Sequence, residues 1–350
     1  MSSVLALHPS SSPRHLGAPT VRSATDRWGR CVAWAAAGSG GPALVDVSGW
    51  LTHLLLDWRA PLSGGFQRAL CSERRVLRLD RPGTGLSAAA PAAPHRDADA
   101  LEAVIEASGD DRVALFAHSF GAAAAVELSI RRPDLVSHLI LFGAAPSRLD
   151  GDALTPELLA ALAALARADW NLAARTIADL LLPGADAATV ASLADHQRIR
   201  AGGDAAAVML DALRDDDLRD MLPRITVPTL VLHRRDDRVV SLLSARAVAS
   251  RIPKARLGVL DGAEHLPYAG DTAAVQEAVN RFLNPAVGLL TPREVDVLRQ
   301  IGEGLTNQEA GLELGVSEAT VARHLANIYL KLDVATRGAA VARARRGGLL

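Results

Sequence analysis

The sequence predicts an α/β fold with a mostly parallel sheet, followed by a small all-α domain. From residue 30 onward, short apolar runs alternate with longer stretches of helical periodicity, which is typical of a parallel sheet covered by helices on both faces. After residue 284 the strand pattern ends, and about 60 residues of helical periodicity follow, enough for a small helical bundle.

The expected strands are short and are bounded by turn or charged residues. They cover residues 31–36, 43–47, 75–79, 112–116, 138–142, 229–232 and 256–260. Helical periodicity lies between several of them, as in 101–108 and 122–131. No strand is expected between residues 149 and 222. That Ala-, Leu- and Asp-rich stretch therefore predicts a helical lid rather than a separate domain.

These patterns divide the chain into four parts. Residues 1–24 mix Ser, Pro, Arg and His without the apolar segment of a secretory signal, so we expect a disordered lead-in. Residues 25–284 form the α/β domain with its lid at 149–222, and Pro285 ends its last helix. Residues 285–290 are a short linker, and residues 291–350 form the helical domain.

Composition excludes several classes of protein. The chain has 350 residues, 38 Lys and Arg against 39 Asp and Glu, and 49% hydrophobic residues, which excludes a polybasic or disordered protein. No apolar run approaches the roughly 18 residues of a membrane span. Cys31 and Cys71 are the only cysteines, so neither a disulfide framework nor a zinc site is expected. We therefore expect a cytoplasmic protein without metal or cofactor.

Three polar residues follow three of the expected strands. Ser119 lies in the tight turn Ala117-His118-Ser119-Phe120-Gly121 between a strand and a helix, whose amino terminus favours developing negative charge. Asp237, with Asp236 as the rival acid, follows the strand at 229–232, and His265 follows the strand at 256–260. The carboxyl ends of parallel strands meet at one sheet edge, and the order Ser, Asp, His is that of a hydrolase triad.

On these motifs, residues 25–284 resemble the α/β-hydrolase family, and residues 80–87 resemble that family's turn after its third strand. The resemblance implies that Ser119 is the nucleophile, His265 the general base and Asp237 the residue that orients it. Asp237 is preferred to Asp236 because Asp-x-Val-Val matches the family spacing. The oxyanion hole is expected at the backbone N–H groups of Phe120 and Trp50, although the loop Ser48-Gly49-Trp50 departs from the usual His-Gly start.

Residues 50–58 (WLTHLLLDW) resemble hydrolase-like sensor domains fused to signalling modules. The candidate pocket residues are Trp50, His53, Trp58 and His118. The alternative for the first three is a capped, packed helix.

The carboxyl-terminal stretch has the signals of a helix-turn-helix. Thr291, Thr306 and Ser317 each precede a helical segment as N-caps, and Gly315 supplies a tight turn. Residues 290–341 resemble the LuxR-type helix-turn-helix family across nearly its full length. The departures are Ala310-Gly311 in place of Ile-Ala and Ala322 where a lysine is frequent. The resemblance implies binding to promoter DNA, and we expect a homodimer that covers two half-sites.

Charge supports a nucleic-acid interface there. Residues 320–350 hold roughly six basic side chains and one acidic side chain, although the whole chain has a net charge of -1. Arg323, Asn327 and Lys331 share one helix face. We expect Arg323 and Asn327 in the major groove, with Thr320 and Lys331 at phosphates. A merely solvated helix face is the alternative, and Glu294 is expected to be a buried scaffold partner.

The sequence thus predicts a one-component transcriptional regulator that senses, and in one version hydrolyses, a small acyl or ester ligand. Two alternatives stay open. One is an active serine hydrolase whose terminal helices serve docking or oligomerisation. The other is a regulator whose hydrolase domain binds a ligand without turning it over.

Overall fold

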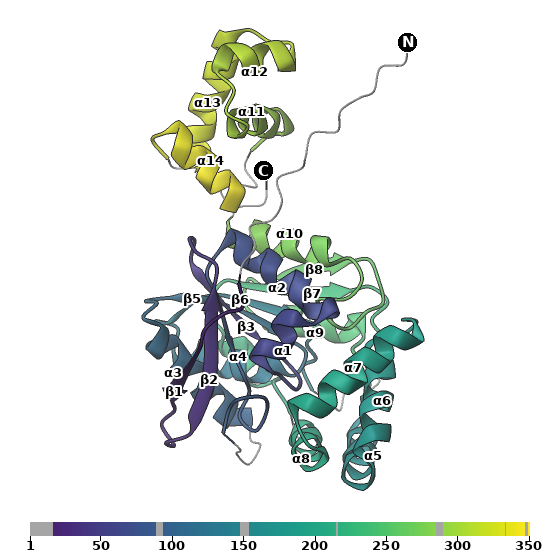
Figure 1. Ribbon diagram of the computed structural model, residues 1–350. Helices are drawn as coiled ribbons and strands as arrows, with labels where there is room; N and C mark the ends of the chain where they lie inside the picture. Colours follow the sequence, from purple (N-terminus) through teal and green to yellow (C-terminus); the bar gives the residue numbers. More distant parts are fainter. Residues whose placement is uncertain are drawn as a thin grey trace, which may run out of the picture.

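A computed structural model describes residues 17–88, 94–147, 154–214, 216–284, 290–332, 334–346 and 349–350 (Figure 1). The predicted α/β architecture with a lid and a helical carboxyl-terminal part is confirmed. Most of the predicted linker, and the first sixteen residues of the predicted lead-in, lie outside the described residues. None of the described helices has both the length and the apolar character that a membrane span requires.

The described residues include one eight-stranded sheet in the order β1-β2-β4-β3-β5-β6-β7-β8. Strands β1 and β4 both pair antiparallel with β2, and the other neighbours are parallel. The carboxyl ends of the parallel strands therefore meet at one edge. The strands are β1 Val21–Thr25, β2 Cys31–Ala37, β3 Ala43–Val47, β4 Val76–Leu79, β5 Val113–His118, β6 Val136–Phe142, β7 Thr229–Arg234 and β8 Arg256–Leu260.

Strand β1 corrects one expectation. Residues 21–24 were assigned to a disordered lead-in, but they belong to β1, which pairs with β2 from Val21 opposite Ala35 to Thr25 opposite Cys31. The sequence VRSAT is polar, and only its Ala24 is buried. Because this edge strand is held by backbone pairing rather than by apolar side chains, its pattern resembles a loop.

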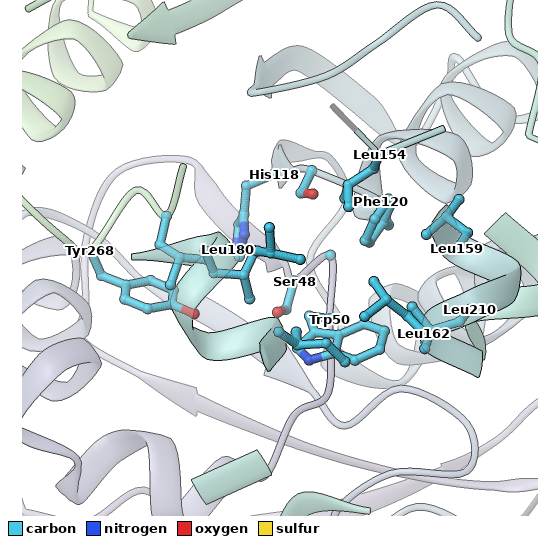
Figure 2. Close-up of a pocket in the computed structure, with 15 residues that line it drawn as sticks. Ser48, Trp50, His118, Phe120, Leu154, Leu159, Leu162, Leu180, Leu210 and Tyr268 are labelled. Carbon is cyan, nitrogen blue, oxygen red and sulfur yellow. The ribbon is translucent and has the colours of Figure 1, made fainter. Parts of the chain in front are cut away.

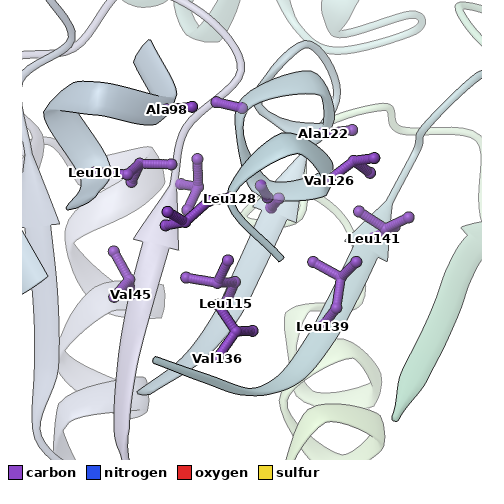
Figure 3. Close-up of a cluster of buried hydrophobic side chains, with 14 of the residues drawn as sticks. Val45, Ala98, Leu101, Leu115, Ala122, Val126, Leu128, Val136, Leu139 and Leu141 are labelled. Atoms are coloured by element: carbon purple, nitrogen blue, oxygen red, sulfur yellow. The ribbon is translucent and has the colours of Figure 1, made fainter. Parts of the chain in front are cut away.

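Helices cover both faces of the sheet, and strand β5 shows the alternation that divides them. Val113, Leu115 and Ala117 pack into the cluster shared with three helices of one face, α3 Pro94–Ser108, α4 Gly121–Arg131 and α9 Leu242–Arg251 (Figure 3). Ala114 and Phe116 pack into the cluster of the other face. That face is covered by α1 Leu54–Arg59, α2 Pro61–Glu73 and α10 Thr272–Leu283. Both faces are buried, as expected for parallel strands.

Four lid helices lie between β6 and β7 (Figure 1). They are α5 Pro156–Ala168, α6 Trp170–Leu181, α7 Ala187–Arg200 and α8 Gly203–Leu213, followed by the short η1 Leu222–Arg224. Thr155, Asp169 and Asp186 cap the first three of them through their side chains. The lid shares one apolar cluster with Trp50, Leu51 and Phe120 of the main domain, so it is packed down on the sheet edge.

Four further helices, α11 Pro292–Gly302, α12 Asn307–Leu314, α13 Glu318–Leu332 and α14 Arg337–Arg346, surround an apolar cluster of their own. Thr291 with Glu294, and Thr306 with Glu309, form capping boxes at the starts of α11 and α12. Gly315 ends α12 with φ 65°, a left-handed conformation that glycine adopts without strain.

Candidate functional site

Ser119 occupies a sharp turn between β5 and α4. Its φ is 53°, a left-handed value that is uncommon for a residue with a side chain, and such strain is concentrated at functional sites. The Ser119 N–H donates to the carbonyl of Phe142 at 2.8 Å, which fixes the turn against β6. A Cβ added to Gly121 would lie 2.5 Å from the Val47 carbonyl oxygen, so glycine is required for α4 to start this close to β3.

The structure brings the three predicted triad side chains into one hydrogen-bonded line. His265 Nε2 lies 2.7 Å from Ser119 Oγ, and His265 Nδ1 lies 2.8 Å from Asp237 Oδ2. All three residues are buried. Asp236, the rival acid, is exposed, and its side chain is not part of this line. The three side chains therefore lie at the distances that nucleophilic catalysis requires.

Asp237 is held in its ionised form. Burial by itself would raise the pKa of the Asp237 carboxyl, but the charge of His265 and its hydrogen bond, with the Val239 N–H at 2.8 Å, lower this pKa below its usual value. The Val240 N–H donates to the same oxygen at 3.2 Å. A carboxylate fixed by two backbone donors can orient the His265 ring and stabilise it when it is protonated.

The loop that carries Trp50 lies directly against the turn that carries Phe120. A Cβ added to Gly49 would lie 2.2 Å from the His118 carbonyl oxygen and 2.7 Å from the Phe120 nitrogen. Only glycine permits this approach of the two backbones. The approach is compatible with the predicted pairing of the Trp50 and Phe120 N–H groups at an oxyanion, and that role stays a prediction.

The Trp50 side chain joins this loop to the lid. Its indole Nε1 donates to Gln197 Oε1 of α7 at 2.7 Å, and Gln197 Nε2 donates to the Ala174 carbonyl of α6 at 2.9 Å. The indole also packs edge-on against the Phe120 ring, with centroids 6.4 Å apart. The lid therefore helps to hold the loop beside Ser119 in its position.

Ser119 lies on the wall of a cavity of about 510 Å³, counted with its open mouth (Figure 2). Besides Ser48, His118, Ser119 and Tyr268, the wall is almost wholly apolar. The apolar residues come mainly from the lid, and they are Leu154, Leu159, Leu162, Ile177, Leu180, Leu181 and Leu210, together with Trp50, Phe120 and Leu266. Sequence reasoning missed these lid residues. The helical periodicity of α5 and α6 marks an apolar face but does not say what that face covers.

Two of the four candidate pocket residues, Trp50 and His118, line this cavity, and the placement of the other two was wrong. The His53 ring caps α1, with its Nδ1 accepting from the Leu56 N–H at 3.4 Å. Trp58 is buried in the cluster between the sheet and α2. For these two, the alternative of a capped, packed helix is the one observed, because α1 turns them away from the cavity.

A series of buried ion pairs, which the sequence analysis did not predict, extends from the turn that carries Ser119 to the lid. His118 Nε2 lies 3.2 Å from Asp46 Oδ1, and Arg78 Nε donates to Asp46 Oδ2 at 3.1 Å. Arg78 Nη2 donates to Asp57 Oδ2 at 3.0 Å, and Arg200 Nη2 lies 2.6 Å from Asp57 Oδ1. The signal was available in the sequence, since a charged residue inside each of the apolar strands ALVDV and VLRL requires a buried partner.

The pKa values of these carboxyls follow from their pairing. Burial would raise the pKa of Asp57, but the charges of Arg200 and Arg78 lower it below its usual value. Burial acts the same way on Asp46, whose pKa is lowered by His118 and Arg78. Both carboxylates are therefore ionised, and the chain of ion pairs ties α7 to the strands beneath Ser119. Among the described residues, no three His, Cys, Asp or Glu side chains form a group that could hold a metal ion.

In the helical domain, α12 and α13 are joined by the turn at Gly315. A Cβ added to Gly311 would lie 2.7 Å from the Val316 carbonyl oxygen, which accounts for a glycine at this departure from the family pattern. Arg323 and Asn327 are exposed on α13, on the face opposite the buried Val321 and Leu325.

The other two predicted DNA contacts, Lys331 and Thr320, each have a hydrogen-bond partner within the helical domain. Lys331 was expected at a phosphate, and its ammonium is held by Glu294, at 2.9 Å from Oε1 and 2.7 Å from Oε2. Its phosphate contact stays a prediction. Glu294 is only 3% exposed. The pair fastens α13 to α11, a long-range contact that helix spacing does not show. The Thr320 hydroxyl lies 2.8 Å from the Ser317 hydroxyl within the cap of α13, and its phosphate contact stays a prediction.

Comparison with known proteins agrees with both parts. The family model described as the alpha/beta hydrolase fold matches residues 42–272, and that of bacterial regulatory proteins of the luxR family matches residues 288–344. The chain is 29% identical over 245 residues to the pimeloyl-acyl-carrier protein methyl ester esterase of Nitrosospira multiformis, covering 65% of this chain and 89% of that esterase. It is 30% identical over 174 residues to the transcriptional regulatory protein LiaR of Bacillus subtilis, covering 49% of this chain and 74% of LiaR.

Solved structures show the same fold. The esterase from Exiguobacterium antarcticum aligns with a TM-score of 0.67 at 23% identity, over 75% of this chain and 98% of that esterase. The chain therefore belongs to the α/β-hydrolase fold family and also carries a luxR-family DNA-binding domain, which makes it a DNA-binding regulator with a hydrolase-like domain.

Proposed function

We propose that this regulator binds and hydrolyses a small acyl ester in its hydrolase domain, and that occupancy or turnover there alters its binding to promoter DNA. The hydrogen-bonded line of Ser119, His265 and Asp237 on the wall of an apolar cavity carries the proposal. A scaffold that had lost its chemistry would have no need of a strained serine, a paired base and an ionised carboxylate together.

In the first half-reaction, Ser119 Oγ attacks the ester carbonyl carbon while His265 Nε2 takes the hydroxyl proton across 2.7 Å. The ionised Asp237 stabilises the resulting imidazolium through Nδ1. The carbonyl oxygen becomes an oxyanion, and the Trp50 and Phe120 N–H groups are the donors assigned to it. His265 then gives its proton to the leaving alcohol as the ester C–O bond breaks, which leaves an acyl group on Ser119.

In the second half-reaction, water attacks the acyl carbon while His265 takes the water proton. Collapse of that intermediate breaks the bond to Ser119, returns the proton to its Oγ and releases a carboxylic acid. The apolar lid residues on the cavity wall favour a hydrocarbon acyl chain over a charged one, because a charge there would be desolvated without a partner.

Labelling with a fluorophosphonate probe tests the hydrolase half. We expect the full chain to be labelled and Ser119→Ala to remain unlabelled. Ser129→Ala is the matched control, since Ser129 is buried on α4 and does not line the cavity. Absence of labelling in the wild-type chain contradicts hydrolysis and favours a regulator that binds its ligand without turnover.

For the DNA half, we propose that Arg323 and Asn327 of α13 reach base edges in the major groove, as their exposure on one face allows. Arg323→Ala should weaken binding to the chain's own upstream DNA by about 10-fold to 100-fold, the cost of one base-reading arginine. Arg299→Ala on α11, also exposed, is the control and should keep its affinity. Equal affinities of the two variants at moderate salt contradict the assignment.

We further propose that the chain binds DNA as a homodimer, because one helix-turn-helix covers only one half-site. A stoichiometry of two chains per duplex in light scattering supports this. One chain per duplex at saturating protein contradicts it.

A further inference from the structure

A second and larger cavity lies between the start of α2 and the lid helix α7. Its volume is about 870 Å³ counted with its open mouth and about 420 Å³ without it, and the smaller value is within the range of small-molecule sites. It is distinct from the cavity at Ser119, but Tyr268 lines both. Its polar wall residues are Ser63, Thr189, Ser192, His196, Arg200 and Tyr268.

The polar residues of α7 form one stripe. Thr189, Ser192, His196 and Arg200 follow one another at spacings of three, four and four, so they share the helix face that lines this cavity. Within the described residues, neither the Ser192 hydroxyl nor the His196 ring has a hydrogen-bond partner, and both are half-buried. A helix face that turns unpaired polar groups toward a cavity is suited to a polar ligand rather than to packing.

The positive charges beside the stripe are paired with carboxylates. The guanidinium of Arg200 is held by Asp57, which also pairs with Arg78, and Arg78 in turn pairs with Asp46. Burial and the nearby charge of Arg200 lower the pKa of His196, so its ring is neutral at neutral pH. The wall therefore offers neutral donors and acceptors and no net positive charge. That chemistry fits hydroxyl groups better than a carboxylate or phosphate.

We propose that this second cavity binds the uncharged, hydroxyl-bearing alcohol part of the ester whose acyl part lies at Ser119. Tyr268 follows His265 by three residues and lines both cavities, so a ligand that occupied both would lie against this ring. The inference rests on the proposed function. It assigns His196 and Ser192 as specificity-determining residues for the alcohol group.

The test compares two esters with the same acyl chain, 1-hexanoylglycerol and ethyl hexanoate, by calorimetric titration of the full-length Ser119→Ala chain, which cannot turn them over. We expect 1-hexanoylglycerol to bind about tenfold more tightly, the effect of one or two extra hydrogen bonds. Adding His196→Leu or Ser192→Leu should remove most of this preference. Arg198→Ala, on the far face of α7, should keep it.

Equal binding of the two esters overturns the proposal, as does a preference that both cavity variants retain. Tighter binding of a hexanoyl ester with a carboxylate on its alcohol part overturns the uncharged class. Two variants are used because Ser192→Leu fills the cavity whereas His196→Leu removes a hydrogen-bonding group, so a folding failure of either one leaves the other decisive. Failure of the wild-type chain to react with fluorophosphonate overturns the hydrolase proposal alone, since these titrations need no turnover.

Discussion

Asp57→Asn removes the central charge of the ionic chain beneath the site while keeping the shape of the side chain. Asp57 is 4% exposed and accepts from Arg78 at 3.0 Å and from Arg200 Nε at 2.9 Å. The amide leaves two buried guanidinium groups without their shared carboxylate and turns an NH2 group toward one of them. Taking one partner from a buried ion pair costs about 3–5 kcal/mol, so we expect a loss of about 4 kcal/mol in the free energy of unfolding.

Urea unfolding followed by tryptophan fluorescence measures this loss in the full chain. All five tryptophans precede residue 171, so the signal reports on the hydrolase domain and not on the DNA-binding domain. Adding Arg200→Met should recover part of the loss, because it removes one of the orphaned cations. A loss below about 1 kcal/mol for Asp57→Asn contradicts the stabilising role of these buried ion pairs, since that is the value of an exposed pair.

The pH dependence gives a second readout of the same change. The pKa of Asp57 is raised by burial but lowered further by Arg200 and Arg78, so it lies below the value of about 4 expected in the unfolded chain. The contribution of this carboxylate is therefore complete above about pH 4 and is lost as the pH falls through the lower folded pKa. The difference between wild type and Asp57→Asn should stay constant from pH 7 to pH 5 and shrink below pH 4.

Three further changes test other parts of the structure. Gln197→Leu leaves the buried Trp50 indole without its hydrogen-bond acceptor. Fluorophosphonate labelling should slow about tenfold, because the loop beside Ser119 loses its contact with the lid. An unchanged labelling rate contradicts a positioning role of this contact. Gly49→Ala places a Cβ 2.2 Å from the His118 carbonyl oxygen and should abolish labelling. Full labelling of this variant shows that the reaction of Ser119 does not require the close approach of the two backbones. Lys331→Met leaves the buried carboxylate of Glu294 without its cation and should destabilise the helical domain by about 2 kcal/mol. Hydrogen exchange of α11 and α13 measures this loss, and unchanged protection contradicts a stabilising role of the ion pair.

The strands and the order of the candidate triad could be predicted from the sequence because both depend on residues close together in the chain. A buried parallel strand is an apolar run whatever its neighbours, so β3 and β5 lie where their patterns predicted them, to within two residues. Ser119, Asp237 and His265 each follow a predicted parallel strand, and sheet topology alone then brings them to one edge. The residues after a strand end were thus predictable without any knowledge of long-range contacts.

The features that the sequence did not show depend on contacts between residues far apart in the chain. Helical spacing puts Lys331 on the face of Arg323 but does not show that Glu294, 37 positions earlier, reaches its ammonium. His53 and Trp58 belong to a short helix whose orientation depends on packing against α2. Apolar periodicity marked helices in the lid, yet which of its leucines face Ser119 depends on how four helices pack together.

If the state of Ser119 alters DNA binding, the effect is measurable in the affinity of the full chain for DNA. Fluorescence anisotropy of the chain's upstream DNA is titrated with the full chain, once unmodified and once phosphonylated at Ser119. We expect both forms to bind, with dissociation constants that differ at least fivefold, a coupling of about 1 kcal/mol. Identical dissociation constants for a fully phosphonylated sample, or no binding by either form, would contradict it.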